Sequence, residues 1–440
     1  MSHKPSQTTP KADAKAALLP KLRFPEFRAA GDWTAERLGS LVSISTEKVG
    51  NAACVPMSIT SGVGLVSQED KFGRVIAGDS YKNYLLLEPN DFAYNKSATK
   101  EFPEGFLALY SGSNLAAVPN SIFTCFRVHG ESPVTTYLNY LFLGNLHGQW
   151  LRNFIQVGAR AHGSLSINDN DLMALPVPLP TGNSSVAEQQ KIADCLSSLD
   201  ELIVAQARKV DALKTHKKGL MQQLFPREGE TQPRLRFPEF EAAADWELKQ
   251  LEDLAKRGSG HTPSKSNPAY YQGGIKWISL ADSRRLDAGL ISETETEISA
   301  QGIKKSSAVL HAAGTVLISR DAGVGKSAVM GLPMAVSQHF IVWTCHAHLL
   351  SNWFLYYLLQ EMKPIFERFA TGSTIKTIGL PFFKELRIAI PALPEQQRIA
   401  DCLTSLAHLI TADTQELETL KNHKKGLMQQ LFPSAEESVA

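Results

Sequence analysis

The sequence contains few cysteines, and none of them belongs to a paired motif. No two form a Cys-x-x-Cys pair, and none stands near a histidine at the spacing of a zinc finger. The five residues are Cys54, Cys125, Cys195, Cys345 and Cys402. Disulfide frameworks and structural zinc sites use clustered cysteines. We therefore expect reduced thiols, with neither a disulfide framework nor a metal site.

Long apolar segments are missing as well. No run approaches the ~18 residues that a membrane span needs. The first 19 residues are polar apart from a short apolar tip before Pro20, and that tip is too short for the centre of a signal peptide. The pattern predicts a soluble cytoplasmic protein with disordered tails at residues 1–19 and 434–440.

The sequence also lacks an excess of charge of either sign. Lys and Arg together number 45 and Asp and Glu 44, which gives a formal net charge of +1. This balance excludes a polycation that coats nucleic acid and a charge-rich disordered chain. Any surface for nucleic acid must therefore be local, with like charges sorted onto one face. The length of 440 residues predicts about three domains.

Catalytic motifs are not recognisable. The run GVGKS at 323–327 has Arg320 where a phosphate loop requires glycine. We interpret it either as a turn that approaches DNA with Arg320 and Lys326 or as a plain hairpin. The run NPAY at 267–270 is close to the Asn-Pro-Pro-Tyr motif of amino-methyltransferases, but no glycine-rich cofactor loop precedes it, so we take it for an unrelated loop. The sequence thus predicts no catalytic residues, no metal and no cofactor in this chain.

What the chain does contain is a long internal repeat. The first part of the repeat opens each half. LRFPEF at 22–27 recurs at 235–240, and the Asp-Trp pair at 32–33 recurs at 245–246, so the offset is 213 residues. Because the two tryptophans stand at equivalent places, we interpret them as packing anchors. The period is too long for a solenoid and predicts a duplicated domain pair.

The second part of the repeat closes each half. Residues 188–196 return nearly unchanged at 395–403, and HKKGLMQQLFP at 216–226 returns at 423–433, with an offset of 207. The stretches in between, about 45–180 and 258–390, barely match. A constant frame with different inserts suits a protein that reads two different targets with one geometry. The alternative is an old duplication in which only the buried frame kept its sequence.

Two long helices with a narrow apolar seam are predicted at 184–226 and 391–433. Their apolar residues alternate at spacings of four and three, which is the a/d pattern of a coiled coil. A helix on a globular surface would show a wider stripe. We therefore expect the two helices to pair through the seam residues Ile192, Leu196, Leu199, Ile203, Gln206, Val210 and Leu213 of the first helix, and Ile399, Leu403, Leu406, Ile410, Asp413, Leu417 and Leu420 of the second.

The two halves predict a pseudo-two-fold relation, and an axis across the helices would make them antiparallel. Gln206 and Asp413 then lie near the centres of their seams, where they could meet. We hypothesise that this polar pair fixes the helix register, as buried polar residues do in coiled coils.

These features resemble the specificity subunits of type I restriction-modification enzymes (HsdS). The likeness rests on the order and repetition of the LRFPEF lead-in, the EQQ(K/R)IA helix start and the HKKGLMQQLFP helix end. It extends to GHTPS at 260–264 and GGIKWIS at 273–279 in the second insert. The first insert departs from that opening, with SISTEK at 43–48 instead.

The resemblance implies an α+β fold, in which two mixed α/β target recognition domains are joined by two long helices that form an antiparallel coiled coil. Each recognition domain would read one half of a split DNA target. The expected division is a tail at 1–19, the first domain with its lead-in at 20–183, the first helix at 184–226, a linker at 227–232, the second domain with its lead-in at 233–390, the second helix at 391–433 and a tail at 434–440.

Polar loops in the two inserts are the candidates for DNA contact, because Arg suits guanine and Asn suits adenine in the major groove. They are Asn95, Lys96, Ser97, Arg160, His162, Ser164, His261, Thr262, Ser264, Lys265, Arg284, Arg285, Arg320, Lys326, Ser373 and Lys376. The alternative for each is a solvated loop. Residues 258–390 carry 13 Lys or Arg against 9 Asp or Glu, which supports contact with phosphate, whereas 45–180 carry 9 against 11, which does not.

The resemblance further implies partners. Two methyltransferase subunits would supply S-adenosylmethionine, and motor-nuclease subunits would supply the ATP and Mg²⁺ chemistry, while this chain would bind double-stranded DNA without catalysis. Two other functions remain open at this point: a coiled-coil scaffold that binds proteins, and a self-contained methyltransferase or nuclease with a divergent active site.

Overall fold

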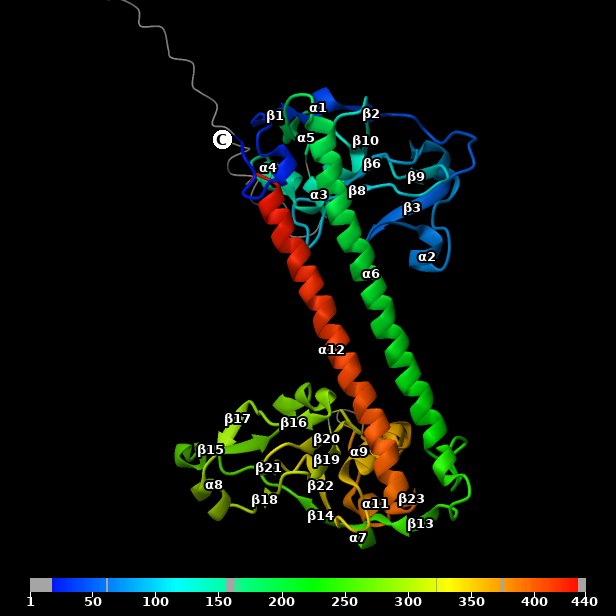
Figure 1. Ribbon diagram of the computed structural model, residues 1–440, viewed down its shortest axis with the longest axis vertical. Helices are drawn as coiled ribbons and strands as arrows, with labels where there is room; N and C mark the ends of the chain where they lie inside the picture. Colours follow the sequence, from blue (N-terminus) through cyan, green and yellow to red (C-terminus); the bar gives the residue numbers. More distant parts are fainter. Residues whose placement is uncertain are drawn as a thin grey trace, which may run out of the picture. The chain divides into compact units, whose positions relative to one another are not determined.

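The chain is divided into two compact units, each of which we describe by itself. The computed structural model describes residues 18–60, 62–155, 163–165, 167–321, 323–372 and 376–433. The first unit holds the residues up to 205 and those from 417 onward, and the second holds 206–416. Both boundaries fall inside the long helices α6 (Ser185–Leu224) and α12 (Leu393–Leu431), so each unit contains a piece of both (Figure 1).

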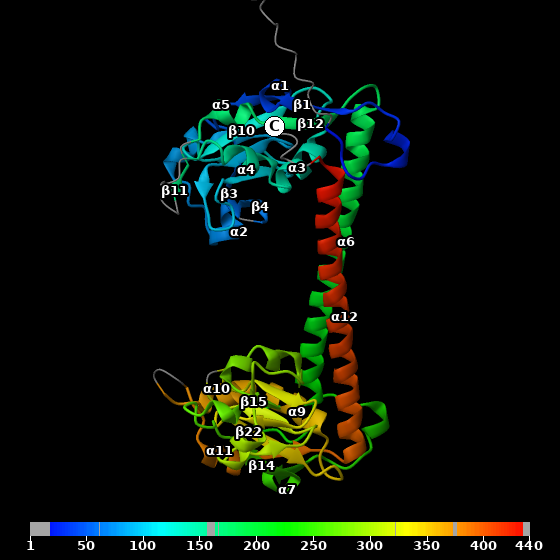
Figure 2. The ribbon, with the colours of Figure 1, turned by 90° about the vertical axis from the view of Figure 1, so that its left-hand side faces the viewer.

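The first unit is built on two small sheets. One has the antiparallel order β2 (Val42–Ser45), β10 (Phe123–Val128), β6 (Phe92–Asn95), β8 (Phe106–Leu109), and the other has the order β4 (Gly64–Ser67), β3 (Val55–Thr60), β9 (Ala116–Val118), β5 (Leu85–Leu87). Two-stranded pairs form between β1 (Trp33–Arg37) and β12 (Pro176–Pro180), and between β7 (Ser97–Ala98) and β11 (Gly163–Ser164). Helices α1 (Leu38–Leu41), α2 (Gln68–Phe72), α3 (Thr135–Leu143), α4 (Leu146–Leu151) and α5 (Asp169–Met173) flank these strands (Figure 2).

The core of the first unit includes the long helices. Phe92, Phe126 and Phe142 pack on one another with ring centroids 5.3 to 6.1 Å apart. The same buried cluster contains Leu196 of α6 and Leu431 of α12. The helix ends are therefore part of the domain core, because their apolar side chains would otherwise be exposed to water.

The second unit has a larger sheet. Its five strands follow the order β14 (Ala255–Ser259), β22 (Phe340–Cys345), β19 (Val316–Ser319), β20 (Ser327–Met330), β16 (Leu290–Ile291). A four-stranded sheet has the order β17 (Thr296–Ile298), β15 (Tyr271–Ile278), β21 (Met334–Val336), β18 (Leu310–His311), and β13 (Glu247–Gln250) pairs with β23 (Arg387–Ile390). The helices are α7 (Leu251–Leu254), α8 (Ala300–Lys304), α9 (Asn352–Glu361), α10 (Lys363–Phe369) and α11 (Leu380–Lys384).

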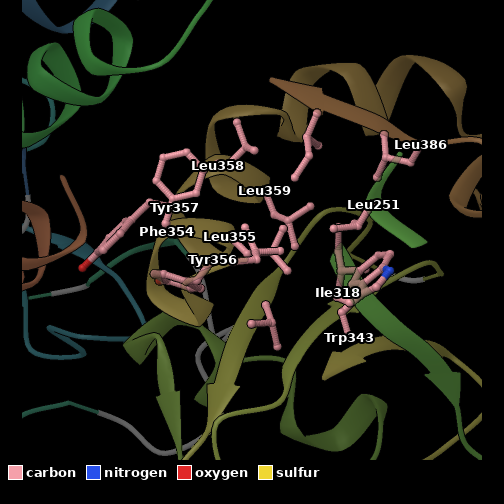
Figure 3. Close-up of a cluster of buried hydrophobic side chains, with 14 of the residues drawn as sticks. Leu251, Ile318, Trp343, Phe354, Leu355, Tyr356, Tyr357, Leu358, Leu359 and Leu386 are labelled. Carbon is pink, nitrogen blue, oxygen red and sulfur yellow. The ribbon is translucent and has the colours of Figure 1, made fainter. Parts of the chain in front are cut away.

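Helix α9 anchors the core of this unit. The oxygen of Ser351 caps its first turn by accepting a hydrogen bond from the backbone N–H of Phe354. Six consecutive residues of α9, from 354 to 359, are buried, and the cluster in Figure 3 joins them to Ile318 and Trp343 of the large sheet. A helix that is apolar on nearly all sides is expected when it is enclosed by a sheet and other helices.

The predicted fold class is confirmed. Each unit mixes sheets with helices, and each unit by itself brings the start of one long helix beside the end of the other, which makes the helices antiparallel. Every predicted seam residue in α6 and α12 is buried or half-buried. The helices are shorter than the predicted 184–226 and 391–433 by one or two residues at each end, which is the usual fraying distance.

Candidate nucleic-acid interface

A buried ion pair joins the lead-in of the first unit to α6. The guanidinium of Arg23 donates from Nε and Nη2 to the two carboxylate oxygens of Glu188, each at 2.7 Å. The Trp33 indole N–H also donates to Glu188, at 3.3 Å. The Glu188 side chain is only 1% exposed. We call this set of three side chains the first clamp.

The second unit repeats the arrangement. Arg236 donates to Glu395 at 2.9 and 2.6 Å, and the Trp246 indole donates to the same carboxylate at 3.3 Å. This second clamp follows from the sequence repeat, since its residues are offset from the first by 213 and 207 positions. The interpretation of both tryptophans as packing anchors is confirmed, because they are 2% and 3% exposed.

The glutamine after each clamp glutamate fastens the long helix to the recognition insert. The side-chain oxygen of Gln189 accepts from the backbone N–H of Val134 at 2.8 Å, just before α3, and that of Gln396 accepts from Ser351 at 2.9 Å, just before α9. On the surface, the pairs Lys191–Glu26 and Arg398–Glu239 also repeat. The repeated sequence therefore holds each insert on its helix.

The centre of the helix seam in the second unit is polar. The Gln206 amide donates to the Asp413 carboxylate at 2.8 Å, and Lys209 donates to the same oxygen at 2.6 Å. The predicted meeting of Gln206 with Asp413 is thus present. Hydrogen bonds from Lys209 and then Gln206 hold the pKa of Asp413 below its usual value.

Two of the predicted DNA-contact residues of the first unit, Asn95 and Lys96, have partners within the protein. Asn95 is 7% exposed, and its side-chain oxygen accepts from the backbone N–H of Ser97 at 2.8 Å. Lys96 pairs with Asp169 at 2.9 Å. The Asn95 oxygen and the Lys96 ammonium are thus engaged within the protein. Pairing of β7 with β11 places Ser97 opposite Ser164, while the side chain of Ser164 and the whole of Arg160 and His162 lie outside the described residues.

Several predicted cations of the second unit are also paired. Lys326 donates to Asp287 at 2.9 Å, and Arg285 contacts Asp282 and Glu295 at 3.1 Å each. Arg284 and Lys376 are exposed, whereas Ser373 lies outside the described residues. Ion pairing therefore engages two of the predicted cations of this unit, Arg285 and Lys326.

The two runs that resemble enzyme motifs, GVGKS and NPAY, lie in a hairpin turn and at a short 3-10 helix. The GVGKS run connects the antiparallel strands β19 and β20 and is followed by a strand, whereas a phosphate loop opens a helix. The run is a hairpin turn with Gly323 and Gly325 at positive φ, Arg320 is one-fifth exposed, and its approach to DNA stays a prediction. In the NPAY run, the Asn267 side chain caps a short 3-10 helix by accepting from the N–H of Ala269.

One cleft in the second unit is lined by several polar side chains. It has a volume of about 740 Å³ and lies where the loop after β14 meets the turn between β21 and β22. Thr262 and Lys265 from the predicted His261–Lys265 loop line it, while Ser264 is exposed and paired with Ser266. Gln338 and His339 line it too, and they could not be found from the sequence because a Ser-Gln-His turn belongs to no motif.

Gly260 allows the loop to approach that turn. A Cβ atom at this position would lie 1.7 Å from the backbone oxygen of Val336, at the end of β21. Only glycine permits such a close contact. The Trp277 indole and the Tyr271 hydroxyl then donate to the carbonyls of His261 and Pro263, which fixes the loop over β15.

The described residues contain neither a candidate metal cluster nor a helix able to span a membrane. Among them, no group of three or more His, Cys, Asp or Glu residues could hold a metal ion. No helix in the same part of the chain is long and apolar enough to cross a membrane.

Comparison with known proteins agrees with this architecture. Residues 243–422 match the family model of the type I restriction modification DNA specificity domain. The MjaX type I restriction enzyme specificity subunit of Methanocaldococcus jannaschii is 26% identical over 331 residues, covering 74% of each chain. The EcoR124I/EcoR124II specificity subunit of Escherichia coli is 24% identical over 283 residues, covering 62% of this chain and 61% of that one.

Two solved structures share the fold. One, from a study of complex assembly and conformational transition of the type I R-M system, has a TM-score of 0.56 and 18% identity, covering 92% of this chain and 98% of its own. The other, the S subunit of a type I restriction-modification system from M. genitalium, has a TM-score of 0.55 and 12% identity, covering 94% and 99%.

Fold, clamps and paired helices define a duplicated protein that holds two different α/β inserts on one repeated frame. This is the class of the DNA specificity subunits. Residues 243–422 match the type I restriction modification DNA specificity domain, and over most of its length the chain is similar to specificity subunits of type I restriction enzymes.

Proposed function

We propose that this chain is the DNA-recognition subunit of a type I restriction-modification complex and binds a split, asymmetric target. The observation that carries the proposal is the pair of equivalent clamps. Arg23–Glu188 and Arg236–Glu395 hold two inserts in the same way on their helices; the inserts differ in sequence but share their strand order, apart from the added strand β16 in the second. Equal mounting with unequal inserts suits the reading of two different half-sites.

The chain itself would be non-catalytic. Two methyltransferase subunits that dock on the two equivalent frames would bind S-adenosylmethionine and methylate adenine, and motor-nuclease subunits would use ATP and Mg²⁺. The relatives are named as specificity subunits of restriction enzymes, which supports further subunits as partners. Since the substrate would be cellular and invading DNA, the proposed place of action is the cytoplasm.

Mapping of methylated adenines in a host genome tests this function. The chain is expressed with its own methyltransferase subunit in a strain without other adenine methylation. We expect a single motif of two defined half-sites separated by an unspecified gap. Exchange of residues 45–180 for the corresponding insert of another family member should change one half-site only. A continuous motif, or no motif from an intact complex, would contradict the proposal.

Two binding experiments address the rival functions. Titration of the purified chain with S-adenosylmethionine should give no heat of binding, whereas a self-contained methyltransferase would bind it. A DNA shift assay with the methyltransferase subunit present should weaken as salt is raised, because binding releases counterions. A protein-binding scaffold would show no such dependence.

We further propose that the paired helices set the gap between the half-sites. Insertion of four residues into both α6 and α12, in phase with the seam, lengthens each helix by ~6 Å. Since base pairs rise by ~3.4 Å, the preferred gap should grow by about one or two base pairs. Four residues inserted into the linker 227–232 provide the matched control and should leave the gap unchanged. An unchanged gap in the helix variant would remove this role.

A further inference from the structure

The cleft of the second unit contains polar atoms that the protein itself leaves without partners. The Ser337 hydroxyl is buried and makes no hydrogen bond, although the residue lines the cleft. Burial of a hydroxyl without a partner is costly, so such an atom usually meets water or a ligand. The volume of about 740 Å³ lies in the range of ligand sites, roughly 300–1,000 Å³.

The tautomer of His339 is set by its neighbour. Its Nδ1 lies 2.5 Å from a carboxylate oxygen of Asp321. Because a carboxylate only accepts, Nδ1 carries the proton, and in a neutral imidazole Nε2 is then an acceptor. No partner for Nε2 is found among the described residues, and the side chain is 32% exposed. His339 therefore offers the cleft a held hydrogen-bond acceptor.

The orientation of Gln338 is set in the same way. Its side-chain oxygen accepts from the Thr262 hydroxyl at 2.6 Å, which leaves the amide NH₂ group as its free end. The side chain is exposed. A donor from Gln338 and an acceptor from His339 thus stand on adjacent residues of one turn. Lys265, also at the cleft and exposed, is placed to meet a phosphate.

We infer that this cleft reads one adenine of the half-site bound by the second unit, through the Gln338 amide and the His339 Nε2. In the major groove, adenine presents an acceptor at N7 beside a donor at N6, which complements one donor beside one acceptor. Guanine presents two acceptors there, thymine an acceptor and a methyl group, and cytosine a donor. The inference rests on the proposed function and names the residues and the base.

The test compares His339→Leu with His348→Leu. His348 is an exposed histidine of the same unit, beyond the other end of β22 and outside the cleft. Each variant is expressed with the methyltransferase subunit, and the methylated motif is mapped. We expect His339→Leu to lose discrimination for adenine at one position of one half-site, by about tenfold or more. The other half-site, the gap and the motif of His348→Leu should stay as in the wild type.

Binding of the reconstituted complex to a duplex series, with each target position changed in turn, completes the test. For His339→Leu the penalty of replacing the one adenine should vanish, while the other penalties remain. Gln338→Ala should weaken discrimination at the same position. Unchanged penalties at every position, or an equal loss of affinity for all duplexes, would overturn the inference. Failure of the wild type to yield a split motif would instead count against the proposed function.

Discussion

The same lysine of the repeated frame has different surroundings in the two units. In the first unit, Lys424 of α12 donates to both oxygens of Asp200, at 2.6 and 2.7 Å, and Tyr140 donates to the same carboxylate at 2.8 Å. In the second unit, Lys217 of α6 lies 5.2 Å from the centre of the Tyr357 ring. The residue equivalent to Asp200 there is Ala407.

The difference shows which parts of the frame are free to diverge. Both lysines lie over a tyrosine of the helix that packs on the sheet, at 5.1 and 5.2 Å. Tyr357 has no carboxylate at this place, and its hydroxyl donates instead to Thr404 at 3.2 Å. Burial lowers the pKa of Lys217, as expected for a cation that gains no carboxylate in return. The clamps are the same in both units, whereas the repeated lysine forms an ion pair only in the first unit.

The largest effect is expected at the clamps, where the two units should behave alike. Arg23→Met and Arg236→Met each leave a buried carboxylate without its cation. Each should cost about 3–5 kcal/mol of stability in its own unit. Urea unfolding followed by hydrogen exchange of α3 and α9 peptides measures the two units separately. Lys191→Met is the control and should change little, because solvent screens its pair with Glu26.

A large loss in one unit from one clamp variant, and none from the other, would break the equivalence of the clamps. It would mean that the remaining packing around one tryptophan suffices to hold its insert.

Acid should separate the two units next. His147 of the first unit is 2% exposed against the rings of Tyr94 and Phe142, and burial lowers its pKa to about 4. Above pH 6.5 it is neutral whether folded or unfolded. Below that, the unfolded chain takes up a proton that the folded unit refuses, so stability falls until about pH 4, by about 3 kcal/mol in total.

Urea midpoints of the first unit, measured by hydrogen exchange between pH 7 and 4, check this dependence. His147→Leu should remove it in that pH window while leaving the second unit unaffected. An equally steep loss in the variant would assign the acid sensitivity to other groups.

Exchange of the carboxylate between the units should have a smaller effect. Asp200→Ala removes a half-exposed ion pair and should cost the first unit roughly 1 kcal/mol. Ala407→Asp places a carboxylate near Lys217 and should raise the stability of the second unit by a similar amount. Ala407→Asn is the neutral control. A second unit that is destabilised by Ala407→Asp would show that the sites are not equivalent in detail.

The smallest effect on stability is expected at the centre of the seam. Replacing Gln206 and Asp413 with leucine adds apolar contact, so unfolding should not become easier, but the helix register should broaden. Distances between spin labels at Arg208 and Thr411 measure the register within the second unit. Leucines at the exposed positions Asp211 and Ala412 form the control. A single unchanged distance, with an unchanged DNA gap, would remove the register hypothesis.

The helices and the frame were largely predictable. The a/d spacing places Leu196 and Leu403 in the seam, and the doubled motifs reveal two equivalent halves, because helix periodicity and repetition are local properties of a sequence. The equivalent places of Trp33 and Trp246 in the repeat indicate packing anchors. The sequence does not indicate their hydrogen-bond partners, Glu188 for Trp33 and Glu395 for Trp246.

The recognition residues were predictable only in part. The loop His261–Lys265 does line the cleft, yet Gln338 and His339, some 75 residues later, were missed. Asn95 has the right chemistry for adenine, but the fold buries it. Whether a polar side chain is free depends on the partners that distant segments bring to it, and neither composition nor spacing reports those partners.

By itself, the sequence determined that this protein is a duplication with two long paired helices and two unlike inserts. Only the tertiary structure decided which charged and polar side chains are paired within the protein and which keep a free polar group. Lys96, Arg285 and Lys326 are paired with carboxylates, whereas Asp321 and Thr262 hold His339 and Gln338 so that one polar edge of each stays free. Hydrogen bonding is a matter of distance in space, and residues far apart in the chain become neighbours only on folding.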